Sequence, residues 1–297
     1  MSNEADIFTI LCAEFADKYK PLTRAEFWKL FHRCGDSVEA MAETTEGRAA
    51  ELMQRRGAIA FGKEKLEQLG VKIVTVADDD FPSRLREKLM DFCPPLLYCS
   101  GNLGILRHKF VGYVGSRTVD EEDISWTEHR LQKNLEAGFG VVTGGAKGID
   151  SVAAQYALQH GAPVVVFLPD SLKEKLRDSS VRRHIYDEEL VVLSHVSPFA
   201  PKMRNSFVAA AMERNKYIYA LSNGTAVVRS DLEKGGTWAG AVEALKHGWA
   251  QVFVWDNKKY PGNQKLIEMG AQGLSDEGER LASPDIPEQI DLFSDVS

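Results

Sequence analysis

The sequence lacks the features that mark several classes of protein. No apolar run is long enough to cross a bilayer, and the N-terminus has no basic segment followed by an apolar stretch. The chain has only four cysteines, without a CxxC pair, and its histidines do not cluster, so we expect no metal site. Buried, reduced thiols are the expected state of Cys12, Cys34, Cys93 and Cys99. We therefore expect a cytoplasmic protein with no membrane contact.

Positive charge is also in deficit. The chain has 36 Lys and Arg residues against 43 Asp and Glu, a net charge of −7. Non-specific binding of polyanions depends on cations that neutralise phosphates, so this balance argues against a generic nucleic-acid binder. It leaves room for a local basic pocket, whose cations must then be named one by one. Such a pocket would have a modest footprint and a strong dependence on salt.

The first 70 of the 297 residues have the pattern of a small helical domain. Apolar residues recur at helical spacing, Thr23 and Glu26 form a capping-box pattern, and Gly35 and Gly70 are typical of helix ends. We predict a helical N-terminal domain over residues 1–70. It serves either as packing support for the rest of the chain or as a surface for a protein partner.

Residues 71–273 have the pattern of an α/β domain. A lead-in, residues 71–108, contains two short strand patterns and is interpreted as a bridge. Apolar strands and helices then alternate; because the strands are apolar on both faces, we predict a Rossmann-like parallel sheet covered by helices. Residues 274–297 form an acidic tail. The strands are predicted at 110–115, 140–144, 163–169, 190–195, 225–230 and 251–256, and the helices begin near Glu122, Ile149, Asn205, Thr237 and Asn263.

Ligands of such sheets bind at the carboxyl ends of the strands, so the turns after the strands carry the candidate residues. The first turn contains Gly115, Ser116 and Arg117. A glycine permits a tight turn, a serine hydroxyl donates to phosphate, and the guanidinium fork of arginine suits phosphate oxygens. Taken alone, a turn with a solvated arginine explains the motif equally well.

The second turn is rich in glycine and leads into a helix. Helix N-termini attract anions through their free N–H groups and their dipole, and Lys147 lies inside this turn. Asp150 caps the helix or binds a sugar hydroxyl. The turn is neither GxxxxGK[ST] nor GxGxxG, so we expect no nucleoside triphosphate or dinucleotide cofactor. The candidate residues are Thr143, Gly144, Gly145, Lys147, Gly148 and Asp150.

Two further clusters follow. Arg214, Asn215 and Lys216 lie within a mostly apolar helical stretch, where cations are costly unless they reach a polar cleft. Lys234 precedes a second glycine-containing helix start, which is a second candidate anion site. Its residues are Gly235, Gly236 and Thr237.

These four clusters, in this order, resemble the DNA-processing protein A family (DprA, also called Smf). Its core motifs are GSR, SGxAxGID, RNR and a glycine-rich turn before the last helices. Asp80-Phe81-Pro82 and Pro95 to Gly101 resemble the family's lead-in, and Pro261 to Ala271 resembles its closing motif. The resemblance runs from about Val71 to Ala271.

The resemblance implies an extended Rossmann fold that binds single-stranded DNA in a basic pocket, with Arg117, Lys147, Arg214 and Lys216 on phosphates. It also implies partners: a RecA-like recombinase and, often, a second copy of the chain. The sequence departs from the family at His195 and Arg229, each where a glutamate is usual, and no C-terminal winged-helix domain is expected. A divergent member that acts in DNA processing, recombination or phage defence fits this pattern.

Two functional hypotheses remain open. The first is a binding protein without catalytic residues, whose bound bases stack on Phe199, Phe207 or Trp238, although a core position is the better expectation for these aromatics. The second is a nucleotide sensor or a nucleotide N-glycosidase of the same superfamily, for which a carboxylate is needed near the sugar. His195 is expected to be a hydrogen-bonded histidine. The candidate carboxylates are Asp150, Asp231, Glu233 and Glu243.

Overall fold

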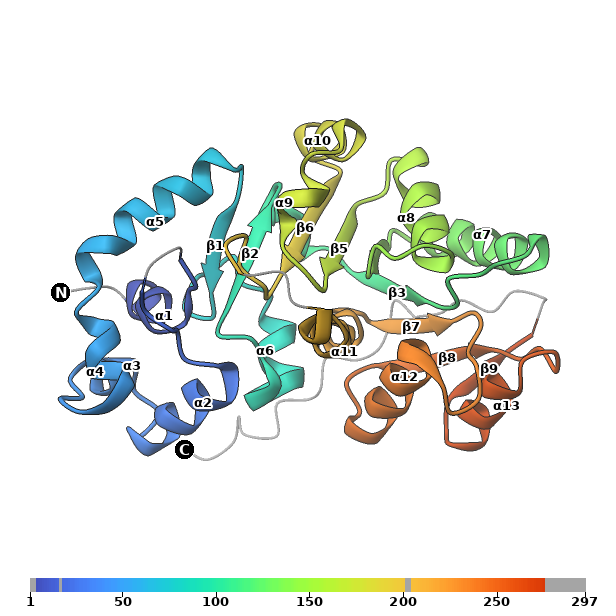
Figure 1. The fold of residues 1–297 in the computed structure, drawn as a ribbon. Coiled ribbons are helices and arrows are strands. Elements are labelled where there is room, and N and C mark those ends of the chain that lie inside the picture. The colour runs from blue at the N-terminus through green and yellow to red at the C-terminus, as the bar shows by residue number, and fades with distance from the viewer. Residues whose placement is uncertain (1–3, 16–17, 201–203, 276–297) are drawn as a thin grey trace, which may run out of the picture.

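The computed structural model describes residues 4–15, 18–200 and 204–275 and is built around a nine-stranded sheet (Figure 1). The strand order is β1-β2-β6-β5-β4-β3-β7-β8-β9. The seven strands from β6 to β9 in this order pair in parallel, whereas β1 pairs with β2, and β2 with β6, antiparallel. The strands are β1 (Lys72–Thr75), β2 (Leu96–Ser100), β3 (Phe110–Val114), β4 (Gly140–Thr143), β5 (Val164–Leu168), β6 (Leu190–Ser194), β7 (Gly224–Val227), β8 (Gln251–Trp255) and β9 (Gln272–Leu274).

The predicted α/β class and all six predicted strands are confirmed. Every residue of β3, β5 and β6 is buried, which agrees with a sheet covered on both faces. The lead-in differs from its interpretation as a bridge: β1 and β2 extend the sheet, with Tyr98 opposite Ser194. The short strand β9 was not predicted, and because Leu274 lies in it, the tail begins later than residue 274.

Helices cover both faces of the sheet, and each face has its own buried apolar cluster. One face is covered by α7 (Glu121–Glu136), α8 (Ile149–Gln159), α9 (Leu172–Lys175) and α10 (Ser179–Tyr186). The other is covered by α6 (Ser83–Leu89), α11 (Arg204–Leu221), α12 (Gly235–His247) and α13 (Pro261–Glu268). The five predicted helices begin within two residues of the predicted positions, and the short helices α6, α9 and α10 were not predicted.

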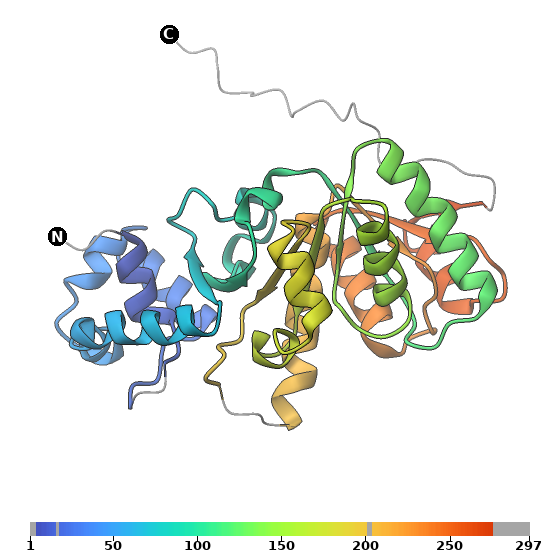
Figure 2. The same cartoon turned by 90° about the horizontal axis from the view of Figure 1, so that it is seen from above.

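The N-terminal helices pack beside β1 and β2, at the end of the sheet opposite β9 (Figures 1 and 2). The predicted capping box is present, because Thr23 accepts from the Glu26 N–H and donates its own N–H to the Glu26 carboxylate. Gly35 and Gly70 adopt positive φ angles of 68° and 71° at helix ends, as predicted. These helices are α1 (Glu4–Cys12), α2 (Arg24–Arg33), α3 (Val38–Ala42), α4 (Gly47–Met53) and α5 (Arg56–Gln68).

Several predictions concern what the chain lacks. No helix among the described residues has the length and apolarity to cross a membrane. The same residues contain no group of three His, Cys, Asp or Glu placed to hold a metal ion. The four cysteines are free; Cys93 and Cys99 are buried as predicted, whereas Cys12 and Cys34 are only partly buried. The acidic tail from residue 276 lies outside the described residues.

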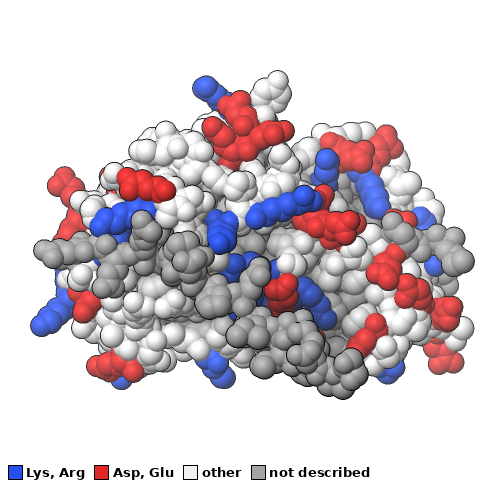
Figure 3. Space-filling view, turned by 180° about the vertical axis from the view of Figure 1, so that it is seen from behind, with Lys and Arg blue, Asp and Glu red and all other residues white. Residues whose placement is uncertain are grey.

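Charges of both signs share the surface. On the face shown in Figure 3, Lys and Arg side chains are interspersed with Asp and Glu and do not form one continuous basic surface. A polyanion that binds on this face therefore needs a local cluster of cations, which is what the net charge of −7 led us to expect of the whole molecule.

Candidate functional site

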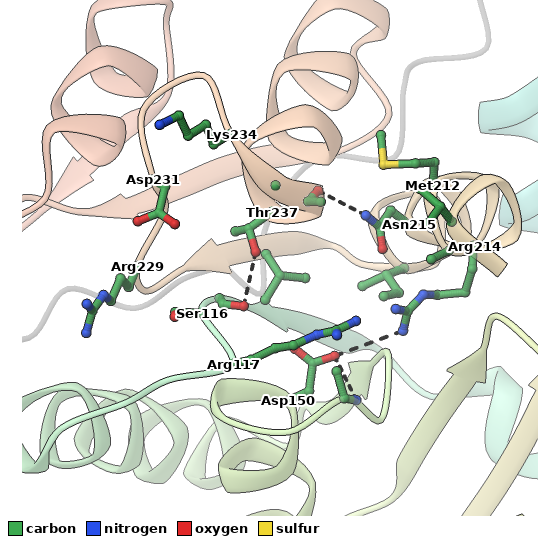
Figure 4. Close-up of a pocket in the computed structure, with 18 of the residues that line it drawn as sticks. Ser116, Arg117, Asp150, Met212, Arg214, Asn215, Arg229, Asp231, Lys234 and Thr237 are labelled. Atoms are coloured by element: carbon green, nitrogen blue, oxygen red, sulfur yellow. Dashed lines mark hydrogen bonds and ion pairs between the residues drawn. The ribbon is translucent and has the colours of Figure 1, made fainter. Parts of the chain in front are cut away.

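One groove lies where the strand order of the sheet reverses. From β3 the chain winds outward through β4, β5 and β6, and α11 then returns it to β7 on the other side of β3. The carboxyl ends of β3 and β7 therefore flank the position at which doubly wound sheets bind ligands. A cavity of about 550 Å³ is located there, between the turns after β3 and β7 and the helices α11 and α12 (Figure 4).

A second cavity of about 460 Å³ continues from the first toward the end of β5. Four residues line both, so we treat the two cavities as one groove: Arg117, Ala146, Phe207 and Arg214.

The turn after β3 forms the floor of the groove. Gly115 accepts a hydrogen bond of 3.0 Å from the Thr237 hydroxyl through its carbonyl oxygen, which ties the start of α12 to this turn. The Ser116 hydroxyl accepts from the N–H of Thr118 at 3.1 Å. Arg117 is exposed and lines both cavities. Of the three predicted residues in this turn, Arg117 thus offers a guanidinium to a ligand, while the other two shape the backbone.

The turn after β4 is closed by a carboxylate of its own. Oδ2 of Asp150 accepts from the N–H groups of Gly144, at 3.1 Å, and Ala146, at 3.3 Å. Burial raises the pKa of Asp150, and the nearby Arg214 guanidinium and these two N–H groups oppose that rise. Two N–H groups of the turn that was predicted to hold an anion, those of Gly144 and Ala146, therefore already hold the Asp150 carboxylate. Asp150 does not act as the predicted cap of its own helix, because the amides that it binds precede α8.

Arg214 reaches the same turn from α11. Its Nη1 donates to the carbonyl oxygen of Phe167 at 3.1 Å and lies 4.0 Å from Oδ2 of Asp150. The side chain is only 7% exposed, yet it lines both cavities. A Cβ atom on Gly144 would lie 1.4 Å from this Nη1, so only glycine leaves room for the guanidinium. Burial lowers the pKa of Arg214 and the charge of Arg117 lowers it further, whereas Asp150 raises it.

Asn215 and Lys216 point in different directions from α11. The Asn215 amide donates to the carbonyl oxygen of Gly236 at 3.0 Å and so shapes the start of α12. Lys216 forms ion pairs with Glu213, at 3.1 Å, and Glu243, at 3.3 Å, and does not line the groove. Successive helix residues are rotated by about 100°, so Lys216 faces almost opposite to Arg214. The prediction that Lys216 belongs to the pocket is therefore wrong.

The start of α12 opens onto the groove. Its N-cap residue, Lys234, makes no side-chain capping hydrogen bond, and Gly235, Gly236 and Thr237 line the first cavity. A helix start with free N–H groups favours negative charge, and the lysine adds to this preference. The start of α12 is therefore a candidate anion site of the kind that was predicted for the turn after β4.

Two cations that line the groove, Arg229 and Lys175, belong to none of the predicted clusters. Arg229 follows β7 and lines the first cavity, where its Nη1 lies 3.2 Å from Asp123. Its place in the sequence could have indicated this position, because Arg229 follows a strand just as Arg117 does. Acidic residues share both cavities: Asp150 and Asp231 line the first, and Asp170, Glu174 and Asp178 line the second.

Most predicted site residues meet at the groove. Thr143 does not, because it is buried and its hydroxyl donates to the carbonyl oxygen of Tyr113. Gly148 lies behind the groove, where a Cβ atom would be 2.2 Å from the carbonyl oxygen of Ser116. The residues that line it are Gly115, Ser116, Arg117, Gly144, Gly145, Lys147, Asp150, Arg214, Asn215, Gly235, Gly236 and Thr237.

His195 and the candidate aromatics have separate positions. Nδ1 of His195 is buried and has no hydrogen-bond partner among the described residues, so the prediction of a satisfied histidine is wrong for this atom. Burial lowers the pKa of His195 to about 4. The residue lines another cavity, near α2, because β6 is three strands away from β3. Phe199 and Trp238 pack against the core, whereas Phe207 is 40% exposed and lines the groove.

Comparisons with known proteins agree with this architecture. The family model of DNA recombination-mediator protein A matches residues 72–283. The chain is 31% identical over 162 residues to the DNA processing protein DprA of Streptococcus pneumoniae, covering 54% of this chain and 55% of that protein. It is 27% identical over 229 residues to the protein Smf of a Synechocystis species, covering 74% of this chain and 56% of that protein. The chain thus spans about half the length of these relatives.

Two solved structures are also similar. The X-ray structure of the S. pneumoniae protein has a TM-score of 0.64 at 23% identity, covering 85% of this chain and 95% of that one. DNA processing protein A of Helicobacter pylori, described for its single-stranded DNA binding mode, has a TM-score of 0.55 at 25% identity, covering 68% of this chain and 90% of that one. Since the family model covers most of the chain, this protein belongs to the DNA recombination-mediator protein A (DprA/Smf) family.

Proposed function

We propose that the chain binds single-stranded DNA through the groove, with Arg117 and Arg214 on backbone phosphates. The observation that carries this proposal is the convergence of two arginines, from the turn after β3 and from α11, on one groove at the carboxyl end of the sheet. Guanidinium groups bind phosphate oxygens in bidentate fashion. Membership of the family and the single-stranded DNA binding described for the H. pylori relative support the same ligand.

The remaining cations give the strand a path. Lys147 and Lys175 line the second cavity, whereas Lys234 lines the first, on the other side of Arg117. Arg229 also lines the first cavity but is paired with Asp123. Phe207 offers an exposed ring beside both cavities, and stacking of a base on an aromatic ring contributes about 1–3 kcal/mol. The strand therefore places phosphates on the arginines and a base on Phe207.

The wider roles rest on the same proposal. Family membership supports a role in cytoplasmic DNA processing and recombination, with a RecA-like recombinase or another protein as partner and a homodimer as the assembly. A role in phage defence stays a prediction. The N-terminal helices are the surface that we assign to a protein partner.

Charge reversal of Arg117 tests the groove. We expect Arg117→Glu to weaken binding of a fluorescent oligothymidylate by at least about tenfold, because a hydrogen bond between charged groups contributes about 1.5–3 kcal/mol. Fluorescence anisotropy measures the affinity. Arg107→Glu is the matched control. Arg107 is also exposed, but it precedes β3 and so lies at the amino ends of the parallel strands, away from the groove. Equal affinities of the two variants and wild type would show that DNA binds elsewhere.

Salt dependence tests the number of phosphate contacts. For single strands, the slope of log K against log salt is about −0.7 per neutralised phosphate. We expect Arg117→Ala to make this slope less steep by about 0.7, and Arg107→Ala to leave it unchanged. A slope near zero for wild type would contradict binding through phosphates.

The alternative, a nucleotide sensor or N-glycosidase, predicts a different outcome. Of its four candidate carboxylates, Asp150 and Asp231 line the first cavity, whereas Glu233 and Glu243 line neither cavity. A thermal-shift screen of mononucleotides and cyclic nucleotides, run beside the oligonucleotide titration, separates the two functions. Stabilisation by a mononucleotide without oligonucleotide binding would favour the sensor.

A further inference from the structure

The turn after β4 holds an anion that belongs to the protein itself. The carboxylate of Asp150 accepts from two backbone N–H groups of this turn, at 3.1 and 3.3 Å, and only 6% of the residue is exposed. A ligand phosphate placed on the same N–H groups would have to displace this carboxylate. The N–H groups of Gly144 and Ala146 are therefore not open to the ligand.

The same carboxylate lies against the most buried cation of the groove. Its Oδ2 is 4.0 Å from Nη1 of Arg214, and this nitrogen also donates to the carbonyl oxygen of Phe167. Nε of Arg214 is buried and has no hydrogen-bond partner among the described residues. The guanidinium is thus held at one nitrogen, between a carbonyl oxygen and a carboxylate.

Arg117 adds a second positive charge beside Arg214, and a nearby negative charge lowers the repulsion between them. Arg117 and Arg214 line the same two cavities, and their like charges repel each other. A carboxylate beside them offsets part of this repulsion in the absence of ligand. Figure 4 shows Asp150 below the two guanidinium groups, with its carboxylate turned toward Arg214.

We propose that Asp150 is a positioning residue for DNA binding: it occupies the N–H groups of Gly144 and Ala146 and acts as the internal counter-ion that holds Arg214 in the groove. It touches neither phosphate nor sugar. This inference rests on the proposed function, and it makes a prediction opposite in sign to that of simple electrostatics, because a carboxylate in a phosphate-binding groove would otherwise weaken binding.

The test compares two substitutions that each remove one negative charge from the groove. Asp231 is exposed and lines the same cavity, but makes none of these contacts. We expect Asp150→Asn to weaken oligothymidylate binding about tenfold, the loss of one charge-assisted contact. We expect Asp231→Asn to strengthen it, since only repulsion is removed. If Asp150→Asn strengthens binding as Asp231→Asn does, Asp150 does not position Arg214.

A second measurement uses the unaltered chain and decides the matter if Asp150→Asn does not fold. A crystal structure with a short oligothymidylate is expected to keep Oδ2 of Asp150 on the N–H groups of Gly144 and Ala146, with a phosphate on Arg214. A phosphate oxygen on those N–H groups, or a deoxyribose in contact with Asp150, would overturn the inference. Failure of the proposed function itself is distinct, because wild type and Arg117→Glu would then bind the oligonucleotide equally.

Discussion

Replacement of Gly144 by alanine tests the packing of the groove directly. The new methyl group would lie 1.4 Å from Nη1 and 2.3 Å from Cζ of Arg214, well inside any permitted contact. Both atoms belong to the guanidinium rather than to a flexible apolar chain end, and the group is held against Phe167 and Asp150. Either Arg214 leaves its position or the turn after β4 moves.

The magnitude follows from the contacts that are lost. Removal of one partner from a buried ion pair costs about 3–5 kcal/mol, and Arg214 and Asp150 are each 6% exposed. The pair is loose, at 4.0 Å, so we expect a loss of about 3 kcal/mol, at the lower end of this range. For a domain of this size, that corresponds to a fall in melting temperature of about 6–12 °C. Loss of Arg214 from the groove should also weaken DNA binding about ten- to a hundredfold.

Differential scanning calorimetry and fluorescence anisotropy measure these two effects. Gly236→Ala is the matched control, because this glycine lines the same groove but its Cβ would meet only the Asn215 amide, at 3.5 Å. In an Arg214→Ala background, Gly144→Ala should cost much less, since the collision is gone. If Gly144→Ala melts and binds DNA like wild type, or if its cost does not depend on Arg214, this account of the groove is refuted.

Two further predictions concern stability. Burial lowers the pKa of His195 to about 4. Between about pH 6.5 and 4, the unfolded chain therefore binds a proton at this residue that the folded chain does not bind. As the pH falls from 7 to 5, His195 should lower the free energy of unfolding by about 2 kcal/mol. Urea titrations should show a weaker loss for His195→Gln, and equal losses would contradict this. Asn263 accepts from the N–H of Ser230 and donates to the carbonyl oxygens of Val228 and Trp255, all within 2.9 Å. Asn263→Ala should therefore lower the free energy of unfolding by about 3 kcal/mol, and a loss below about 1 kcal/mol would show that these bonds are not needed.

The parallel part of the sheet was predictable because its signal is local. Strands buried on both faces are runs of apolar residues, and the alternation with helices implies parallel pairing. The direction in which β2 pairs is not local, because its partner β6 lies about ninety residues further along the chain. The sequence of the lead-in, residues 71–108, therefore did not reveal whether its strands connect two domains or extend the sheet by antiparallel pairing.

The sequence indicated site residues correctly where a single residue follows a strand. It failed where residues adjacent in the sequence were assigned together to the same pocket. Arg117 and Arg229 both follow a strand and both line the groove. Arg214 and Lys216 are two residues apart in a helix, and helical periodicity alone would have separated them. The closed turn after β4 was beyond such rules, because a glycine-rich sequence does not reveal whether its N–H groups are open or already bound to a nearby carboxylate such as Asp150.

The proposed function requires an acidic protein to bind a polyanion, and the charge of the groove is compatible with this. The first cavity has the cations Arg117, Arg214, Arg229 and Lys234, against the carboxylates Asp150 and Asp231. Asp150 is committed to the turn and Arg229 to Asp123, so the charge left for a ligand is small and resides mainly on Arg117, Arg214 and Lys234. A few phosphates saturate such a site, whereas the net charge of −7 repels the rest of a long strand. Affinity should therefore stop rising with oligonucleotide length after a few nucleotides.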